Sequence, residues 1–289
     1  MDRKALVEKL TEMLLSSSPS LKGMAGHFDG SYETQRMLLR GLMNMYQPDS
    51  EPSQVFFALQ DELLGAERDE RPAVEFAKLP LNPLSAKVRL YRGDLLDLKT
   101  DAVVNPANSS LLGCFIAGHD CVDNLIHSAA GLQLRFECKK LIEARGAPLK
   151  PGEAVITGAY NLKASKIIHT VAPEVSGHFE EKERKALTAC YVSCLEIAKQ
   201  HHLTSVAFPC LGSGGHAFPH AEAAAIAVRA VSEQLQKDPE TPKAVFVCED
   251  QVDYDAYALA FEEEHQRIVN PGVKKKPATL SALWDLTLK

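Results

Sequence analysis

The stretch TDAVVNPANSSLLG, residues 100–113, decides the fold. Its apolar run, Ala102 to Val104, has the length and the side chains of a short strand, and Asn-Pro ends it. The run shows no alternation of polar and apolar residues, which is typical of a strand in a sheet that is covered on both faces. A loop of small and polar residues follows.

Similar runs recur along the chain. They are VRLY (88–91), AVITG (154–158), KIIHTV (166–171), SVAFP (205–209) and AVFV (244–247). Helical patterns lie between them, and the clearest cover residues 132–145, 181–200, 221–236 and 253–268. Strands that alternate with helices predict an α/β fold, with helices on both faces of one sheet.

The first 80 residues have a different pattern. Apolar residues recur at helical spacing in three short segments, separated by breakers such as SSSPS at residues 16–20. We expect a helical extension at 1–80 that packs on the core, a main domain at 81–270, and a tail at 271–289. The tail reads as a basic linker with a short docking segment.

Composition limits the function. The 289 residues carry a net charge of −6, which argues against a nucleic-acid polymer as the main partner. No apolar stretch reaches the roughly 18 residues of a membrane helix, and the N-terminus lacks the features of a secretory signal. The seven cysteines fit reduced thiols better than a disulfide scaffold. We therefore expect a cytoplasmic protein with no membrane partner.

Ligands of such folds bind at the carboxyl ends of the strands, so three loops matter. The first is RGDLLDL, residues 92–98. The Asp94 carboxylate could accept a hydrogen bond from an amino group such as that of adenine. Taken alone, Asp94 is more simply the cap of a turn or helix.

The second loop begins at Asn105. The amides of Asn105 and Asn108 suit the hydroxyls of a ribose. Asp123 opens a helical pattern, either as its N-cap or as a general base that orients a water or a ribose hydroxyl. His127 lies one turn further on and is expected to be a packed helix residue.

This loop also contains GCFIAGHDC, in which Cys114, His119 and Cys121 are spaced Cys-x4-His-x-Cys. Thiolates and an imidazole suit zinc, and three protein ligands leave a fourth position for water or substrate. The alternative is two inert cysteines beside a surface histidine. Cys138 falls within a helical pattern and is assigned to the core.

The third loop, CLGSGGHAFP, follows the strand at 205–209 and precedes a helix. Its glycines allow successive N–H groups to turn toward an anion, and the helix N-terminus adds a partial positive charge. A diphosphate is the expected ligand. Many glycine-rich turns only reverse the chain, and that alternative stays open for the loop taken alone.

The ordered set GDLLDL, TDAVVNPANSSLLG, VDNLIHSAAG and PCLGSGGHAFP resembles a macrodomain, a module that binds ADP-ribose. The resemblance covers about residues 87–269. A glycine run usually precedes VD in this family, and CFIAGHDC replaces it here. In this respect, and in its helical N-terminal part, the chain is similar to the zinc-dependent macrodomains, a class of microbial ADP-ribosylhydrolases. The resemblance implies a three-layer α/β/α domain with a mixed central sheet.

The resemblance also implies roles for individual residues. Adenine would be bound by Asp94 and Leu95, the distal ribose by Asn105 and Asn108, the diphosphate by Gly212, Ser213, Gly214, Gly215 and His216, and Zn²⁺ by Cys114, His119 and Cys121. Asn108 and Asp123 would act in catalysis beside the three ligands. Pro106 and the sequence LGSGGHAF depart from the usual pattern and could change the shape of both loops.

The implied activity is hydrolysis of mono-ADP-ribose from a protein side chain. An ester to Asp or Glu is the best chemical guess, because a carboxylate leaves readily. The expected partners are ADP-ribose and mono-ADP-ribosylated protein. Three alternatives remain: a reader that only binds the modification, a deacylase of O-acyl-ADP-ribose, and a structural α/β protein with a stray zinc site.

Overall fold

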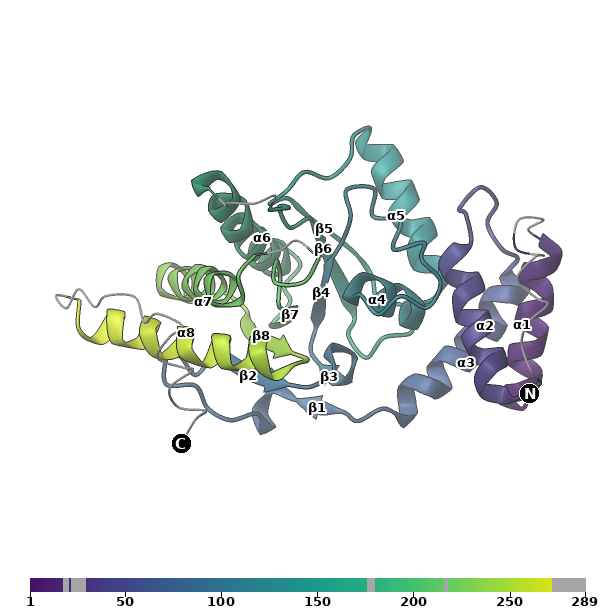
Figure 1. Cartoon of the computed structure of the whole chain (residues 1–289), viewed down its shortest axis with the longest axis horizontal. Coiled ribbons are helices and arrows are strands. Elements are labelled where there is room, and N and C mark those ends of the chain that lie inside the picture. Colours follow the sequence, from purple (N-terminus) through teal and green to yellow (C-terminus); the bar gives the residue numbers. More distant parts are fainter. Residues whose placement is uncertain (18–20, 22–29, 176–179, 216–217, 272–289) are drawn as a thin grey trace.

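Six strands form one sheet at the centre of the computed structural model, which describes residues 1–17, 21, 30–175, 180–215 and 218–271 (Figure 1). Across the sheet they are β2 (Val88–Arg92), β8 (Lys243–Cys248), β7 (Ser205–Pro209), β4 (Ala102–Pro106), β6 (Lys166–Thr170) and β5 (Ala154–Gly158). All neighbours are parallel except β5, which runs antiparallel to β6. The predicted strands and the mixed sheet are confirmed.

Helices cover both faces of this sheet (Figure 1). One face carries α6 (Glu181–Gln200), α7 (His220–Lys237) and α8 (Gln251–Val269), and the other carries α4 (Val122–Ala130) and α5 (Leu132–Arg145). Successive side chains of a strand point to opposite faces, so Val104 packs in the first apolar core and Val103 in the second. The strands are covered on both faces by these cores, which explains why they are largely apolar.

The helix predictions are confirmed almost to the residue. The helices predicted at 132–145 and 181–200 have those bounds. The helix predicted at 253–268 begins earlier, at Gln251, because Asp250 caps it: the Asp250 carboxylate accepts from the Asp253 N–H at 2.8 Å. Among the described residues, no helix combines the length and apolar character that a membrane span requires.

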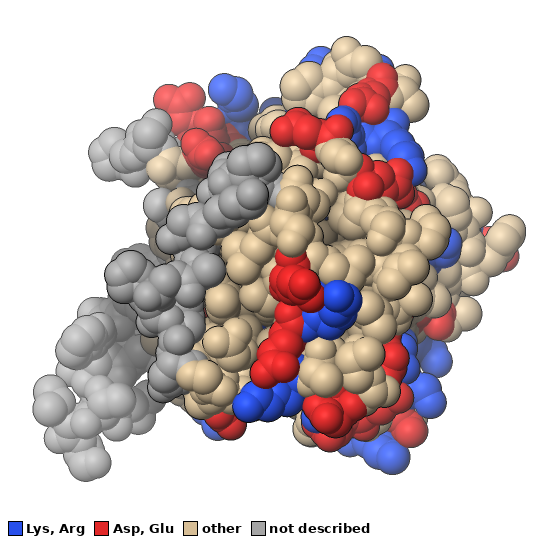
Figure 2. Space-filling view, turned by 90° about the vertical axis from the view of Figure 1, so that its right-hand side faces the viewer, with Lys and Arg blue, Asp and Glu red and all other residues tan. Residues whose placement is uncertain are grey.

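The N-terminal helices are α1 (Arg3–Ser17), α2 (Tyr32–Met45) and α3 (Gln54–Glu70). They bury leucines and aromatic residues in a third apolar core, which Leu132 and Phe136 of α5 complete. The extension thus packs on the side of the domain that carries α4 and α5 (Figure 1). Acidic and basic side chains are interspersed on this end of the molecule (Figure 2), in keeping with ion pairs such as Arg3–Glu70 at 2.6 Å.

The connections from α3 to β2 and from β2 to β4 contain short elements that periodicity could not reveal. β1 (Val74–Glu75) pairs in parallel with β3 (Leu98–Lys99), and two 3₁₀ turns, η2 (Phe76–Lys78) and η3 (Leu95–Asp97), flank them. Two residues are too few for an alternation pattern. From residue 272 on, the predicted tail lies outside the described residues.

Candidate metal and nucleotide site

The three candidate metal ligands converge in the loop between β4 and α4. The ligand atoms of Cys114, His119 and Cys121 all lie within 4.8 Å of one another, and Cys114 Sγ is 3.5 Å from His119 Nδ1. Both cysteines are partly buried, while His119 is exposed. Two thiols and an imidazole, open to solvent on one side, fit a zinc ion with a free coordination position. We call residues 114–121 the metal loop.

Cys121 also caps α4. Its sulfur accepts from the Asn124 N–H at 3.4 Å, so the helix begins at Val122, and the suggestion that Asp123 is the N-cap is wrong. Burial raises the pKa of Cys121 to about 11, and the neighbouring Cys114 adds to the rise. The thiol is therefore protonated at neutral pH without a cation, and binding a metal would release protons.

Glycine conformation shapes the metal loop. Gly113, with φ of +81°, lies against the His127 ring so closely that a Cβ would come within 2.9 Å of it. The exposed Asn108 braces the approach: its Nδ2 donates to the Gly113 carbonyl at 3.0 Å, and its Oδ1 accepts from the Ser110 N–H at 3.0 Å. The predicted contact of Asn108 with ribose stays a prediction, and this bracing role was not predicted.

Asp123 is buried beside the metal loop. Its Oδ1 accepts from Asn105 Nδ2 at 2.8 Å. Burial raises the pKa of Asp123 to about 6, against the opposing effects of the Asn105 amide and the Arg135 charge. Asn105 is itself fully buried and also contacts His169 Nδ1 at 3.1 Å. In this structure Asn105 orients Asp123, and its predicted contact with ribose stays a prediction.

A second group of metal-type side chains lies beneath the site. The ligand atoms of His127, Cys138 and His169 are also within 4.8 Å of one another, and all three residues are buried. They come from α4, α5 and β6. The sequence assigned His127 and Cys138 to the core, which is confirmed, but it gave no sign that His169 would join them, because a histidine inside an apolar strand has no distinguishing pattern.

Asp94 caps a short helix and also forms an ion pair. Its Oδ1 accepts from the Leu96 N–H at 2.8 Å, which caps η3. Its Oδ2 is paired with Arg71, which follows α3 and also lies 2.9 Å from the Asp97 carboxylate. Leu95 is buried. The sequence missed Arg71, since nothing in the chain pattern pairs residue 71 with residue 94.

The loop after β7 has a left-handed glycine, as the sequence predicted, at Gly212. Gly212 has φ of +93°, and its carbonyl accepts from the Phe218 N–H at 3.0 Å. A Cβ at Gly214 or Gly215 would meet nothing within 4 Å among the described residues. Ser213 Oγ donates to Asp253 at 3.1 Å. His216 lies outside the described residues. This loop leaves β7 beside β4, so it lies next to the loop that follows β4.

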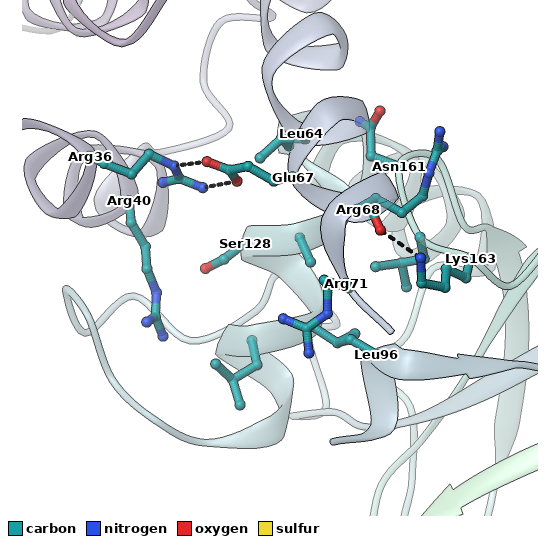
Figure 3. A pocket seen from close by; sticks show the side chains of 13 residues that line it. Arg36, Arg40, Leu64, Glu67, Arg68, Arg71, Leu96, Ser128, Asn161 and Lys163 are labelled. Carbon is teal, nitrogen blue, oxygen red and sulfur yellow. Dashed lines mark hydrogen bonds and ion pairs between the residues drawn. The ribbon is translucent and has the colours of Figure 1, made fainter. Parts of the chain in front are cut away.

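A cavity of about 320 Å³ lies between the extension and α4 (Figure 3). Arginines of the extension line it, among them Arg36, Arg40 and Arg71, together with Ser128 of α4. Figure 3 shows Arg36 reaching across to Glu67, while Arg40 points away from that pair. The sequence gave no hint of this cavity, because its walls are far apart along the chain.

The macro domain family model matches residues 104–227. The chain is 40% identical over 236 residues to the protein-ADP-ribose hydrolase of Staphylococcus aureus (strain COL), a match that covers 81% of this chain and 87% of that protein. It is 35% identical over 241 residues to the protein-ADP-ribose hydrolase of Treponema medium, with 82% and 90% covered.

Solved structures agree. The Oceanobacillus iheyensis macrodomain with ADP superimposes with a TM-score of 0.57 and 32% identity, covering 62% of this chain and 92% of that one. The Trypanosoma brucei macrodomain in complex with ADP-ribose gives a TM-score of 0.58 and 26% identity, covering 72% and 90%. The chain belongs to the macro domain family. The family assignment made from the sequence is therefore confirmed, together with the fold.

Proposed function

We propose that this chain is a zinc-dependent hydrolase that removes mono-ADP-ribose from modified side chains of proteins. Relatives named protein-ADP-ribose hydrolase match it at 35% and 40% identity over more than four-fifths of its length, which supports the hydrolase activity. The observation that carries the metal assignment is the convergence of Cys114, His119 and Cys121 within 4.8 Å at the end of β4.

The nucleotide would lie along the carboxyl ends of neighbouring strands. Adenine would meet Asp94 and Leu95 after β2, and the distal ribose would meet Asn108 after β4. The diphosphate would be held after β7 by Gly212, Ser213, Gly214, Gly215 and His216. No described residue comes within 4 Å of a Cβ placed on Gly214, which supports this, because an anion could approach its N–H group closely.

A zinc ion at the metal loop would supply Lewis acidity and a bound water of lowered pKa. Asp123, two residues after Cys121, would orient a ribose hydroxyl or the attacking water through its carboxylate. Asn105 supports that role, because its amide fixes one carboxylate oxygen and leaves the other for a further donor. The ester linkage to Asp or Glu is the preferred substrate, since a carboxylate is a good leaving group.

The Cys114→Ala variant tests this proposal. We expect turnover of a mono-ADP-ribosylated protein to be lost while ADP-ribose binding persists, because the adenine and diphosphate contacts lie in other loops. Turnover is followed by release of ADP-ribose, and binding by calorimetric titration. Full turnover by the variant, or by enzyme shown to be free of metal, would refute a catalytic zinc.

The same assays separate the alternatives. A reader would bind modified protein tightly without releasing ADP-ribose. A deacylase would act faster on O-acyl-ADP-ribose than on modified protein. A structural protein would give no binding signal with ADP-ribose.

A further inference from the structure

Two side chains of helix α2, in the extension, form hydrogen bonds with the backbone of the metal loop. Arg40 Nη2 donates to the carbonyl oxygen of His119 at 2.8 Å. One turn further along α2, Asn44 Oδ1 accepts from the N–H of Gly118 at 3.0 Å. The two contacts fix the peptide groups on either side of the Gly118–His119 bond, and His119 is one of the three candidate ligands.

Helix α4 holds the same loop through Asn124, and α2 holds Asn124. Asn124 Nδ2 donates to the carbonyl of Ile116 at 3.0 Å and lies 3.4 Å from that of Cys114. Arg40 in turn donates to Asn124 Oδ1 at 3.1 Å. Asn44 Nδ2 donates to Ser128 Oγ at 2.9 Å, and Ser128 donates to Asn124 Oδ1 at 3.1 Å. Arg40 and Asn44 thus act on the loop both directly and through Asn124.

The asparagines of this hydrogen-bond network are buried, whereas the loop that they contact is exposed. Asn44 is 1% exposed and Asn124 is fully buried, whereas the loop that they hold is largely exposed, with Ile116 at 62%. An exposed loop that is not anchored must be ordered by the ion, and the conformational entropy that this ordering costs is lost from the binding free energy. Anchors that fix the loop beforehand leave more of the metal–ligand energy available as affinity.

A buried arginine strengthens the same connection. Arg135 of α5 donates from Nε to the Leu112 carbonyl at 2.8 Å, at the start of the loop. Its Nη1 donates to the carbonyls of Met43 and Tyr46 at 2.8 and 2.7 Å, at the end of α2. Its guanidinium also lies over the Phe115 ring, 4.7 Å from the centroid. The guanidinium of Arg135 therefore links the end of α2 to the segment that leads into the metal loop.

We propose that Arg40 and Asn44 are positioning residues for the metal site, so that the N-terminal extension is a working part of that site. This rests on the proposed function, since it assumes that the metal loop binds zinc. It concerns residues that contact neither the ion's ligand atoms nor the reacting atoms. Their effect is expected in metal affinity and ligand geometry, with ADP-ribose binding unchanged.

The test compares Arg40→Met with Arg36→Met. Arg36 lies one turn earlier on the same helix and lines the same cavity, but it pairs with Glu67 at 2.6 and 2.8 Å (Figure 3). Zinc affinity is measured by competition with a chromophoric chelator. We expect Arg40→Met to weaken zinc binding about tenfold or more, as for other residues that orient metal ligands, and Arg36→Met to keep wild-type affinity.

Two further measurements separate positioning from a loss of folding. Asn44→Leu keeps the branched shape of the side chain and removes both hydrogen bonds, and it should weaken zinc binding in the same way. Arg40→Lys keeps a donor and should restore part of the affinity. The visible spectrum of the Co²⁺-substituted protein should change in Arg40→Met and Asn44→Leu but not in Arg36→Met. Calorimetric titration with ADP-ribose should give the wild-type dissociation constant in all of these variants.

The possible failures are distinguishable. A wild-type protein that takes up neither zinc nor cobalt overturns the metal site and this inference together. A wild-type protein that binds zinc, with Arg40→Met and Asn44→Leu binding it equally well, overturns the positioning role alone. Equal losses in Arg40→Met and Arg36→Met also overturn it, because they would indicate a general effect of damaging α2.

Discussion

Among the residues that the structure describes, two clusters of histidine and cysteine side chains lie within one region. The surface cluster is Cys114, His119 and Cys121, and the buried cluster is His127, Cys138 and His169. Each has three ligand atoms within 4.8 Å of one another. By proximity alone they would be equivalent candidates for a metal ion.

Their surroundings differ. In the buried cluster both ring nitrogens of His169 are occupied, Nδ1 by Asn105 at 3.1 Å and Nε2 by Thr157 at 2.9 Å. Burial raises the pKa of the Cys138 thiol far above its usual value. The surface cluster instead presents an exposed imidazole and two partly buried thiols. A metal ion needs ligand atoms with free lone pairs and a path from solvent to reach them. Of the two clusters, only the surface cluster offers both.

The largest expected effect distinguishes the two clusters by function. Cys114→Ala should lower turnover by more than about 100-fold, since a lost ligand costs more than a lost supporting contact. Cys138→Ala should leave zinc content and turnover at the wild-type level. Elemental analysis and the hydrolase assay measure both quantities. Loss of zinc in Cys138→Ala with retention in Cys114→Ala would reverse the assignment.

The next prediction concerns the contribution of hydrogen bonds inside the buried cluster to the stability of the fold. His169→Leu removes one hydrogen-bond partner from the buried amide of Asn105 and one from the hydroxyl of Thr157, and should cost about 2–4 kcal/mol of unfolding free energy. Neither ring nitrogen of His127 has a hydrogen-bond partner among the described residues, so His127→Leu should cost less than about 1 kcal/mol. Urea unfolding measures both values. Equal costs would show that packing, and not hydrogen bonding, makes the cluster stable.

Substitution of two glycines tests the close contact between the segment that leads into the metal loop and His127 of the buried cluster. At Gly113, φ is +81° and an added Cβ would strike the His127 ring. Gly118 also has positive φ, at +64°, but a Cβ there meets nothing within 4 Å among the described residues. Gly113→Ala should cost about 2–3 kcal/mol and Gly118→Ala about 1 kcal/mol. Thermal or urea unfolding gives the comparison, and a larger loss at Gly118 would contradict the close approach to His127.

A further prediction is a pH dependence of stability. Burial lowers the pKa of His169 to about 3 and that of His127 well below its usual value. Below about pH 6.5 the unfolded imidazoles bind protons while the folded ones do not, so stability falls by up to about 1.4 kcal/mol per pH unit for each. Asp123, with its raised pKa, opposes this below about pH 6 because the folded carboxyl binds its proton first.

Urea unfolding at several values between about pH 7 and about pH 5 measures this slope. His169→Leu should flatten it, because one of the two imidazoles is gone. A wild-type stability that does not change over this range would show that the buried histidines are protonated as readily as free ones.

Much of the fold was predictable from the sequence, for a physical reason. The strands are buried on both faces, so their apolar runs stand out, and α5 and α6 have the predicted bounds. Cys114, His119 and Cys121 lie within eight residues of one another, so their proximity as candidate metal ligands could be predicted without any knowledge of the tertiary structure.

What the sequence could not predict depends on contacts between distant segments. Arg71 meets Asp94, 23 residues away, and Arg40 meets His119, 79 residues away. No local pattern encodes such partners. The two-residue strand β1 and the place of His169 beside Cys138 depend in the same way on how the sheet and helices are stacked.

Arg135 has a consequence for cooperativity. Its side chain is 2% exposed, and its donors are shared between the carbonyls of α2 and that of Leu112. Melting the extension by itself would remove two of those acceptors and leave a charge stranded in the protein interior, which is costly. We therefore expect the extension and the sheet to unfold in a single transition, and amide hydrogen exchange in α2 to be as slow as in the central strands.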